Sequence, residues 1–284
     1  KKEKMTPRTF ITFCRSIVMA GKSHQIESLA VSFEDLVFKT VEAKYGRNWI
    51  ASTIAENFAL GAYTFTKYKS EVKKEKQLTD IVVYGVENKE ERTAFEKGST
   101  VAHYVNLARD TSNASADDMT PTKLGKSAQS AVKGTKVKVT VLGEKELQKL
   151  NMRLLLAVGQ GTKHETKFIV MEYWGLKKPG ASLTKNKALQ PIVFVGKGIT
   201  YDTGGLNVKP SGHMHDMHMD MSGGSTVISA IACVAKLGLK KNIIALIPSA
   251  ENAVSDSAMR AGDIITAMNG KTVEVLHTDA EGRM

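Results

Sequence analysis

The chain has 284 residues, 42% hydrophobic and 24% charged, which is ordinary for a globular protein of one or two domains. No apolar run approaches the roughly 20 residues of a membrane-spanning helix, and no secretory signal follows the charged start. The two cysteines, Cys14 and Cys233, form no Cys-x-x-Cys pair and are too few for a disulfide framework. We therefore expect a soluble cytoplasmic protein without a membrane partner.

The net charge of +11 suggests an acidic partner at first sight. Most of the positive excess lies in residues 112–191, whereas residues 192–284 are close to neutral. A nucleic-acid surface is one interpretation of the basic segment. A solvated lysine-rich face is the interpretation that we favour.

The first third of the chain predicts helices and one strand. Ser28–Lys44 and Trp49–Phe65 carry apolar residues three and four apart, as amphipathic helices do. Ile81–Tyr84 is a β-branched run before a glycine and predicts a buried strand. Glu90–Ala108 predicts a long helix with one apolar stripe.

Small polar residues fill the segment from Asp110 to Pro121, which we take as the boundary between domains 1–111 and 112–284. Thr120 and Pro121 predict the N-cap and first residue of a helix over residues 122–133. Strand and helix patterns then alternate, which predicts an α/β domain with a mostly parallel or mixed sheet. The predicted strands are Lys136–Leu142, Leu154–Val158, Lys167–Tyr173, Pro191–Val195 and Asn242–Ile247, and the predicted helices are Glu144–Leu150 and Thr226–Leu237.

Acidic residues gather in glycine-rich segments of the last third. The segment GKGITYDTGG (196–205) follows an apolar strand and puts Lys197 and Asp202 at its carboxyl end, where open α/β sheets bind ligands. If residues 277–283 are extended, Asp279, Glu281 and Arg283 line one surface. Together with Asp220, these acids cannot all stay ionised at one site without cations, and divalent metals are the natural counter-charge.

These segments resemble a known family. GKGITYDTGG, Lys209-Pro210, MDMSGG (219–224) and NGKTVEVLHTDAEGR (269–283) have the order and spacing found in M17 leucyl aminopeptidases. Weaker resemblance extends over nearly the whole chain. It implies a smaller amino-terminal α/β domain and a larger α/β catalytic domain with a mixed central sheet of the zinc-peptidase type. It also implies that the chain is incomplete at its carboxyl end.

The resemblance implies a metal-dependent enzyme that removes leucine or another apolar residue from peptides with a free amino terminus. Two divalent cations are implied, usually zinc, which manganese, magnesium or cobalt can replace. By motif position, Asp202 and Glu281 would bridge both cations, Asp279 would complete the first site, and Lys197 and Asp220 would complete the second. A ligating lysine must be neutral, so without metal we expect Lys197 to be protonated and paired with the acids.

The same resemblance assigns three further residues. Lys209 would stabilise the tetrahedral oxyanion, Arg283 would hold a bicarbonate that serves as general base, and Met217 would line the pocket for an apolar side chain. The family forms homohexamers, which we expect here as well. His277 stands where the family usually has asparagine, and Asn151 where it usually has glycine.

Other interpretations remain at this point. His213, His215 and His218 are histidines of a loop near the site rather than ligands, because the five residues named above already fill both metal positions. Asp202-Thr203-Gly204 also matches an aspartic protease, but no second such triplet exists in the chain. A nucleic-acid-binding or scaffold protein on the same fold is the alternative function.

Overall fold

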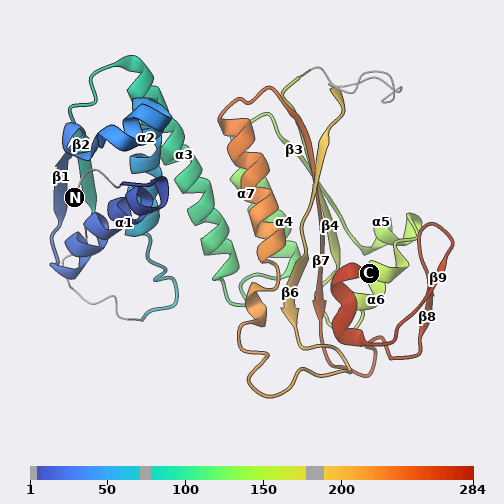
Figure 1. Cartoon of the computed structure of the whole chain (residues 1–284). Coiled ribbons are helices and arrows are strands. Elements are labelled where there is room, and N and C mark those ends of the chain that lie inside the picture. Colours follow the sequence, from blue (N-terminus) through green and yellow to red (C-terminus); the bar gives the residue numbers. More distant parts are fainter. Residues whose placement is uncertain (1–4, 71–77, 177–188) are drawn as a thin grey trace. The chain divides into compact units, whose positions relative to one another are not determined.

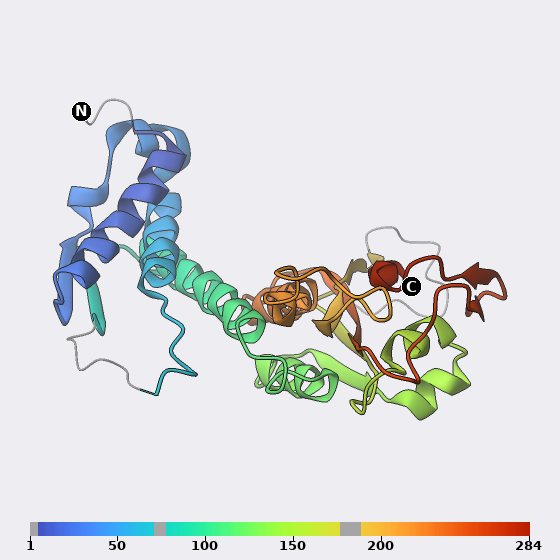
Figure 2. The same ribbon diagram turned by 90° about the horizontal axis from the view of Figure 1, so that it is seen from below.

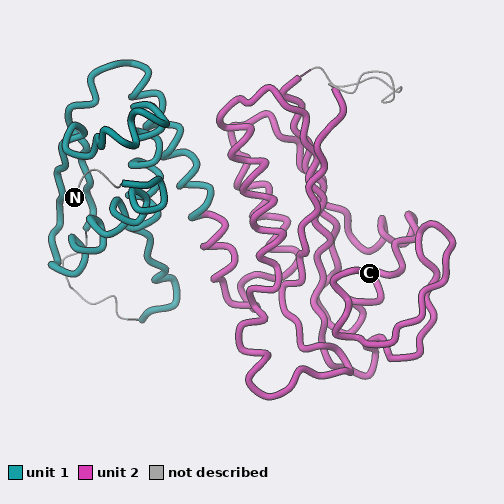
Figure 3. The backbone as a smooth tube through the Cα atoms, viewed as in Figure 1, with its two compact units in different colours: residues 1–106 teal, residues 107–284 magenta. Residues whose placement is uncertain are grey.

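The computed structural model describes residues 5–70, 78–176 and 189–284 (Figure 1). Its contacts divide the chain into two compact units, residues 1–106 and 107–284 (Figure 3). The division falls inside helix α3 (Lys89–Ser112), so this one helix contributes residues to both units. Among the described helices, none is long and apolar enough to cross a membrane.

The first unit packs its helices around an aromatic and aliphatic core. Phe10, Phe33, Ile50 and Ile54 are fully buried there. Strands β1 and β2 pair in parallel, in register from Ser28↔Asp80 to Ser32↔Tyr84. The elements of this unit are α1 (Pro7–Ser23), β1 (Ser28–Ser32), η2 (Glu34–Leu36), α2 (Lys39–Ala62), β2 (Asp80–Tyr84) and the first part of α3.

The prediction of a helix over Ser28–Lys44 is wrong. Its first residues form β1, because they pair with β2. The two strands are far apart in the sequence, so a local apolar pattern could not reveal this pairing. The strand at 81–84 is confirmed but is not buried, since Val82 and Tyr84 are 52% and 56% exposed on one face. Helix α1 was not predicted, although Thr6 caps its first turn and Pro7 opens it.

The second unit is built on a mixed sheet, which confirms the predicted α/β class. Within the described residues the strands lie in the order β3-β4-β7-β5, with β6 also paired to β7. β4 pairs antiparallel with both β3 and β7, whereas β5 and β6 run parallel to β7. Helices α4 and α7 cover one face, and α5 and α6 lie on the other (Figures 1 and 2). The elements are α4 (Pro121–Ala131), β3 (Lys138–Leu142), α5 (Glu144–Lys149), α6 (Arg153–Gly159), β4 (Lys167–Trp174), β5 (Ile192–Val195), β6 (Gly198–Asp202), η4 (Met217–Met219), α7 (Ser222–Lys236), β7 (Asn242–Asn252), β8 (Ile264–Thr266), β9 (Thr272–Glu274) and η5 (Thr278–Arg283).

Most local predictions in this unit are confirmed, with one reversal. Thr120 does cap α4, since its side chain accepts a hydrogen bond from Lys123 N. Leu154–Val158 is not a strand but lies in helix α6, because a short apolar run fits a buried helix as well as a buried strand. Asn151 has a positive φ of 54°, which explains why a glycine would suit this turn before α6.

Strand β7 positions the two strands β5 and β6, which flank Lys197. β5 pairs with it up to Val195↔Leu246, and β6 resumes at Gly198↔Ser249 with the same offset. The two strands are thus one line of chain along a single edge of β7, interrupted where Lys197 lies. Both end toward the side of the sheet at which β7 also ends, with Asn252.

We predict that Gly98→Ala destabilises the first unit. A Cβ on this buried residue of α3 would overlap the carbonyl oxygen of Ser52 in α2, and a backbone atom cannot swing aside. The better helix propensity of alanine, about 1 kcal/mol, is then outweighed, and we expect the free energy of unfolding to fall by about 1–3 kcal/mol. Urea denaturation followed by circular dichroism measures it. The exposed neighbour is the control, since Ser99→Ala should change stability by less than about 0.5 kcal/mol; equal effects would contradict the close helix contact.

Candidate functional site

Lys197 occupies the break between β5 and β6, and glycines allow the amino end of α7 to approach its backbone. A Cβ on Gly196 would lie 2.6 Å from the carbonyl oxygen of Gly223, so only glycine fits there. The backbone N–H of Gly224 donates to the carbonyl oxygen of Lys197 at 2.7 Å. This hydrogen bond satisfies the backbone carbonyl of Lys197 where the strand pairing is interrupted. It also fixes the position from which the lysine side chain extends.

Asp202 ends β6 in a fixed setting. The pairing with β7 shifts between Ile199 and Asp202, which places a β-bulge just before the acid. Asp202 is 2% exposed, and its Oδ1 accepts from Gly204 N and from Asn252 Nδ2, both at 2.9 Å. Its other oxygen, Oδ2, lies 3.0 Å from Lys209 Nζ.

Thr278 holds the carboxyl-terminal acidic segment against the loop after β6. This fully buried residue exchanges hydrogen bonds with Asn207, one from Asn207 N to Thr278 Oγ1 and one from Thr278 N to Asn207 Oδ1, both at 2.8 Å. Its hydroxyl donates to the carbonyl oxygen of Gly204 at 2.6 Å. His277 Nδ1 accepts from Asp279 N at 3.2 Å, so His277 serves as the N-cap of η5.

The extended conformation considered for residues 277–283 is not found, because Thr278–Arg283 forms the irregular short helix η5. Asp279 has φ −91° and ψ 18°, a turn-like backbone that the Thr278 and His277 hydrogen bonds support. Asp279 and Glu281 nevertheless converge, through this turn rather than through strand alternation. Arg283 is exposed.

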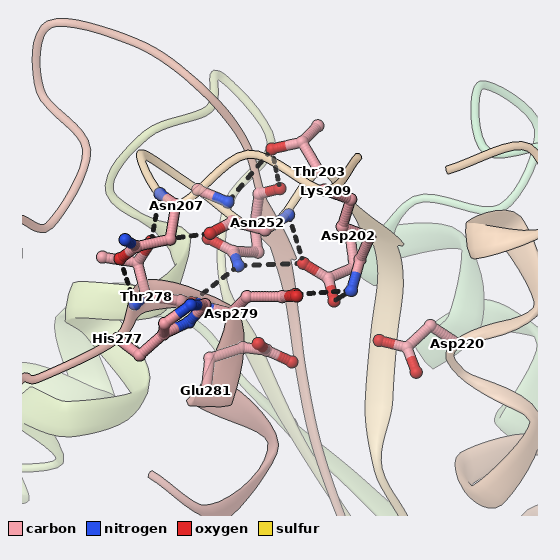
Figure 4. A network of polar contacts seen from close by, with 12 residues as sticks. Asp202, Thr203, Asn207, Lys209, Asp220, Asn252, His277, Thr278, Asp279 and Glu281 are labelled. Atoms are coloured by element: carbon pink, nitrogen blue, oxygen red, sulfur yellow. Dashed lines mark hydrogen bonds and ion pairs between the residues drawn. The ribbon is translucent and has the colours of Figure 1, made fainter. Parts of the chain in front are cut away.

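Three carboxylates and one ammonium group meet at the end of β6 (Figure 4). Oxygens of Asp202, Asp279 and Glu281 lie within 4.8 Å of one another, close enough to hold a metal ion. Lys209 Nζ contacts both Asp202 and Asp279 and thus lies between them. Here the lysine provides the positive charge that this group of acids requires.

A second lysine joins the remaining acid to this group. Lys197 Nζ lies 2.8 Å from Asp220 Oδ2 and 2.8 Å from Glu281 Oε1. Gly282 permits this placement, because a Cβ there would lie 3.0 Å from Lys197 Nζ. Lys197 thus bridges Asp220 and Glu281.

The charges of this site do not balance. Asp202, Asp220, Asp279 and Glu281 face two lysines, which leaves a formal excess of negative charge. Burial raises the pKa of Asp220, and the nearby Asp202 and Glu281 add to this despite Lys197. Burial lowers the pKa of each lysine, but the ion pairs more than offset this, so both pKa values lie above the ordinary lysine value.

Unsatisfied oxygens show that the residues suit additional cations. In the described part of the chain, Asp220 Oδ2 and both oxygens of the buried Glu281 lack a partner with hydrogen-bonding geometry, although Lys197 pairs with two of them. A buried carboxylate without such partners is costly. Oxygen ligands of this kind suit hard or borderline divalent metals.

The structure also places the other predicted residues. Met217 is half-buried at the start of η4, the short helix that leads to Asp220. His213 and His215 are exposed and His218 is half-buried, and Nδ1 of His218 lies 3.3 Å from the carbonyl oxygen of His215. They are not in the carboxylate group that could hold a metal.

Sequence analysis missed three polar residues that organise the site, Asn207, Asn252 and Thr278. Asn252 is a buried amide at the carboxyl end of an apolar strand, the position that had drawn attention to Lys197 and Asp202. The same positional signal would have found it if the strand had been predicted to its end instead of only to Ile247.

Comparison with known proteins decides the family. Residues 106–284 match the model of the catalytic domain of the cytosol aminopeptidase family, and residues 1–72 match its amino-terminal domain. The chain belongs to the cytosol aminopeptidase family. Curated relatives include the probable cytosol aminopeptidases of Bdellovibrio bacteriovorus, 37% identical over 100% of this chain and 55% of the relative, and of Nitrosospira multiformis, 38% identical over 84% and 45%. The chain thus spans about half the length of these relatives.

Two solved structures share the fold of this chain. The bottromycin maturation enzyme BotP in complex with Mn has a TM-score of 0.81 and 28% identity, over 99% of this chain and 55% of that one. The cytosol aminopeptidase from Coxiella burnetii has a TM-score of 0.71 and 26% identity, over 85% of this chain and 48% of that one. The two-domain α/β architecture is therefore that of M17 aminopeptidases.

We predict that Glu281→Gln stabilises the metal-free protein. The substitution removes one buried negative charge and keeps an acceptor for Lys197, so we expect the melting temperature in EDTA to rise by roughly 2–4 °C, which corresponds to about 1 kcal/mol. The rise in melting temperature on adding Mn²⁺ should become smaller, because a ligand is lost. Differential scanning fluorimetry measures both.

Glu165→Gln is the matched control, since Glu165 lies outside the site. Its Oε2 pairs with Lys167 Nζ at a distance of 2.7 Å. Hydrogen bonding to Lys167 lowers the pKa of Glu165, so losing this carboxylate should slightly destabilise the protein and leave the Mn²⁺ response unchanged. If the melting temperature of Glu281→Gln in EDTA is lower than that of the unsubstituted protein, the idea that excess negative charge destabilises the site is contradicted.

Proposed function

We propose that the chain carries the catalytic site of a metal-dependent aminopeptidase, a hydrolase that removes the amino-terminal residue from peptides. The observation that carries this proposal is the meeting of the buried Asp202 and Glu281 with the half-buried Asp279. Two lysines do not balance the negative charge there, and neither oxygen of Glu281 has a partner with hydrogen-bonding geometry. Membership of the cytosol aminopeptidase family supports the same activity. Leucine or another apolar first residue is the substrate that we propose.

Five residues would hold two divalent cations. Asp202 and Glu281 would be shared between them, Asp279 would complete one site, and Lys197 with Asp220 would complete the other. Bound cations would supply Lewis-acid polarisation of the peptide carbonyl and activation of water. Lys197 would have to lose its proton and leave Asp220 and Glu281, so metal binding should release a proton.

Lys209 has a different part in this proposal. Its ammonium group now neutralises Asp202 and Asp279. When cations take over that neutralisation, Nζ becomes free to donate a hydrogen bond to the oxyanion that forms at the peptide carbonyl.

Two further assignments rest on the family resemblance and on exposure. Arg283 presents an exposed guanidinium, whose planar donor pairs suit a bicarbonate that would accept and return the proton of water. Met217, half-buried just before Asp220, would contact the apolar first side chain of the substrate.

The cation identity and the assembly are also part of the proposal. Zinc is the cation that we propose, with manganese, magnesium or cobalt as substitutes, and the related BotP is described in complex with Mn. We propose a cytoplasmic location, in keeping with relatives that are named cytosol aminopeptidases. The homohexamer that we propose rests on the family resemblance. The aspartic-protease alternative is disfavoured, because Asp202 lies against Lys209 instead of sharing a proton with a second carboxyl group. A nucleic-acid-binding or scaffold role is the remaining alternative.

Release of aminomethylcoumarin from leucyl-aminomethylcoumarin tests the proposal. After chelation the purified protein should be inactive, and Zn²⁺ or Mn²⁺ should restore release. Asp279→Asn should abolish it because a ligand is lost. Lys209→Met should still bind metal, yet its kcat should fall roughly 10²–10³-fold, as for the loss of one oxyanion donor.

A folded protein that binds no divalent cation and releases no product would contradict the aminopeptidase. Glu165→Gln, outside the site, should keep the activity of the unsubstituted protein. A nucleic-acid titration of the same preparation would then test the alternative.

A further inference from the structure

Asn252 is buried among the acids without being an acid itself. It is 1% exposed and ends the central strand β7. Its side-chain nitrogen donates to Asp202 Oδ1 at 2.9 Å and to the carbonyl oxygen of Thr278 at 3.1 Å. Its backbone carbonyl oxygen accepts from both the N–H and the hydroxyl of Thr203 at 2.9 Å (Figure 4). One residue therefore contacts two of the three segments that carry the acids.

These contacts make the two oxygens of Asp202 unequal. Oδ1 accepts from two donors, Gly204 N and Asn252 Nδ2, whereas Oδ2 pairs with the ammonium group of Lys209. With two fixed donors on one oxygen, the carboxylate cannot rotate freely about its terminal bond. Without Asn252, one backbone N–H would be the remaining fixed donor to Oδ1 that the described residues provide.

The same amide links the segment that carries Asp202 to the segment that carries Asp279. The second proton of Asn252 Nδ2 reaches the backbone of Thr278, the residue directly before Asp279. Gly205 leaves room for this bridge, because a Cβ there would lie 2.9 Å from both Asn252 Oδ1 and Thr278 Oγ1. A neutral amide can donate to both neighbours, whereas a carboxylate in its place would repel Asp202.

We propose that Asn252 is a positioning residue of the metal site, whose carboxamide fixes Asp202 and ties it to Thr278 so that Asp202, Asp279 and Glu281 present their oxygens together. The inference rests on the proposed function, since it assigns Asn252 a task in holding the same cations. Groups that orient metal ligands typically contribute roughly 10–100-fold to metal affinity.

Calorimetric titration of the chelated protein with Mn²⁺ tests this inference. Asn252→Ala should raise the Kd for Mn²⁺ by roughly 10–100-fold. Asn242→Ala is the matched control, because Asn242 is an equally buried amide at the other end of β7. Asn242 Nδ2 donates to the carbonyl oxygen of Leu189 at 2.8 Å, and its Oδ1 accepts from Leu176 N at 3.1 Å. Both variants should lose stability, but the control should keep the Mn²⁺ affinity of the unsubstituted protein.

Asn252→Ser provides a second variant should the alanine variant fail to fold. Its hydroxyl keeps the site polar and admits water beside Thr278, yet it is too short to hold Asp202, so the same loss of affinity is expected. If Asn252 variants bind Mn²⁺ as tightly as Asn242→Ala does, the positioning role is overturned while the proposed function stands. If the unsubstituted protein itself binds no Mn²⁺, the proposed function fails and the inference fails with it.

Discussion

Four carboxylates share a small volume at the carboxyl end of β6, and the surrounding structure is organised around the electrostatic cost of holding them there. Like charges this close oppose each other's ionisation, and burial adds to the cost. Lys197 and Lys209 offset part of it from two sides, one between Asp220 and Glu281 and the other between Asp202 and Asp279. The lysines thus act as internal counter-ions that divalent cations would replace.

The sheet supplies the rigidity that such a site requires. β7 pairs with β4 on one side and with the interrupted line of β5 and β6 on the other, so it fixes the break from which the Lys197 side chain extends. Glycines at the break allow the start of α7 to approach closely, and Asp220 lies just before this helix. Asn252 and Thr278 then join β7 to the last acidic segment. The acids therefore come from three separate segments but are held by one framework.

The sequence was sufficient for the fold class and for the identity of the charged residues at the site. Glycine-rich segments after apolar strands point to close backbone approach, and acids in such segments point to a ligand. Their geometry was not predictable in the same way. Residues 277–283 are a turn because Asn207 and His277 hold them by hydrogen bonds, and no local pattern reveals the partner 71 residues away.

The errors elsewhere have the same origin. Ser28–Ser32 forms a strand because β2 pairs with it. Leu154–Val158 lies in a helix whose buried apolar side chains pack with those of β6 and β7. Local apolar spacing fits both outcomes, so tertiary contacts decided between them. Asn252 was missed because sequence analysis searched for charge, whereas its part in the site depends on two amide protons with fixed directions.

A crystal structure of the protein grown with Mn²⁺, with anomalous diffraction recorded at the manganese edge, tests the central claim most directly. We expect two anomalous peaks among Asp202, Asp220, Asp279 and Glu281, with Lys209 Nζ withdrawn from Asp279 and Lys197 Nζ turned to one of the ions. Both lysines still paired with the acids, and no peak between the carboxylates at saturating Mn²⁺, would contradict it.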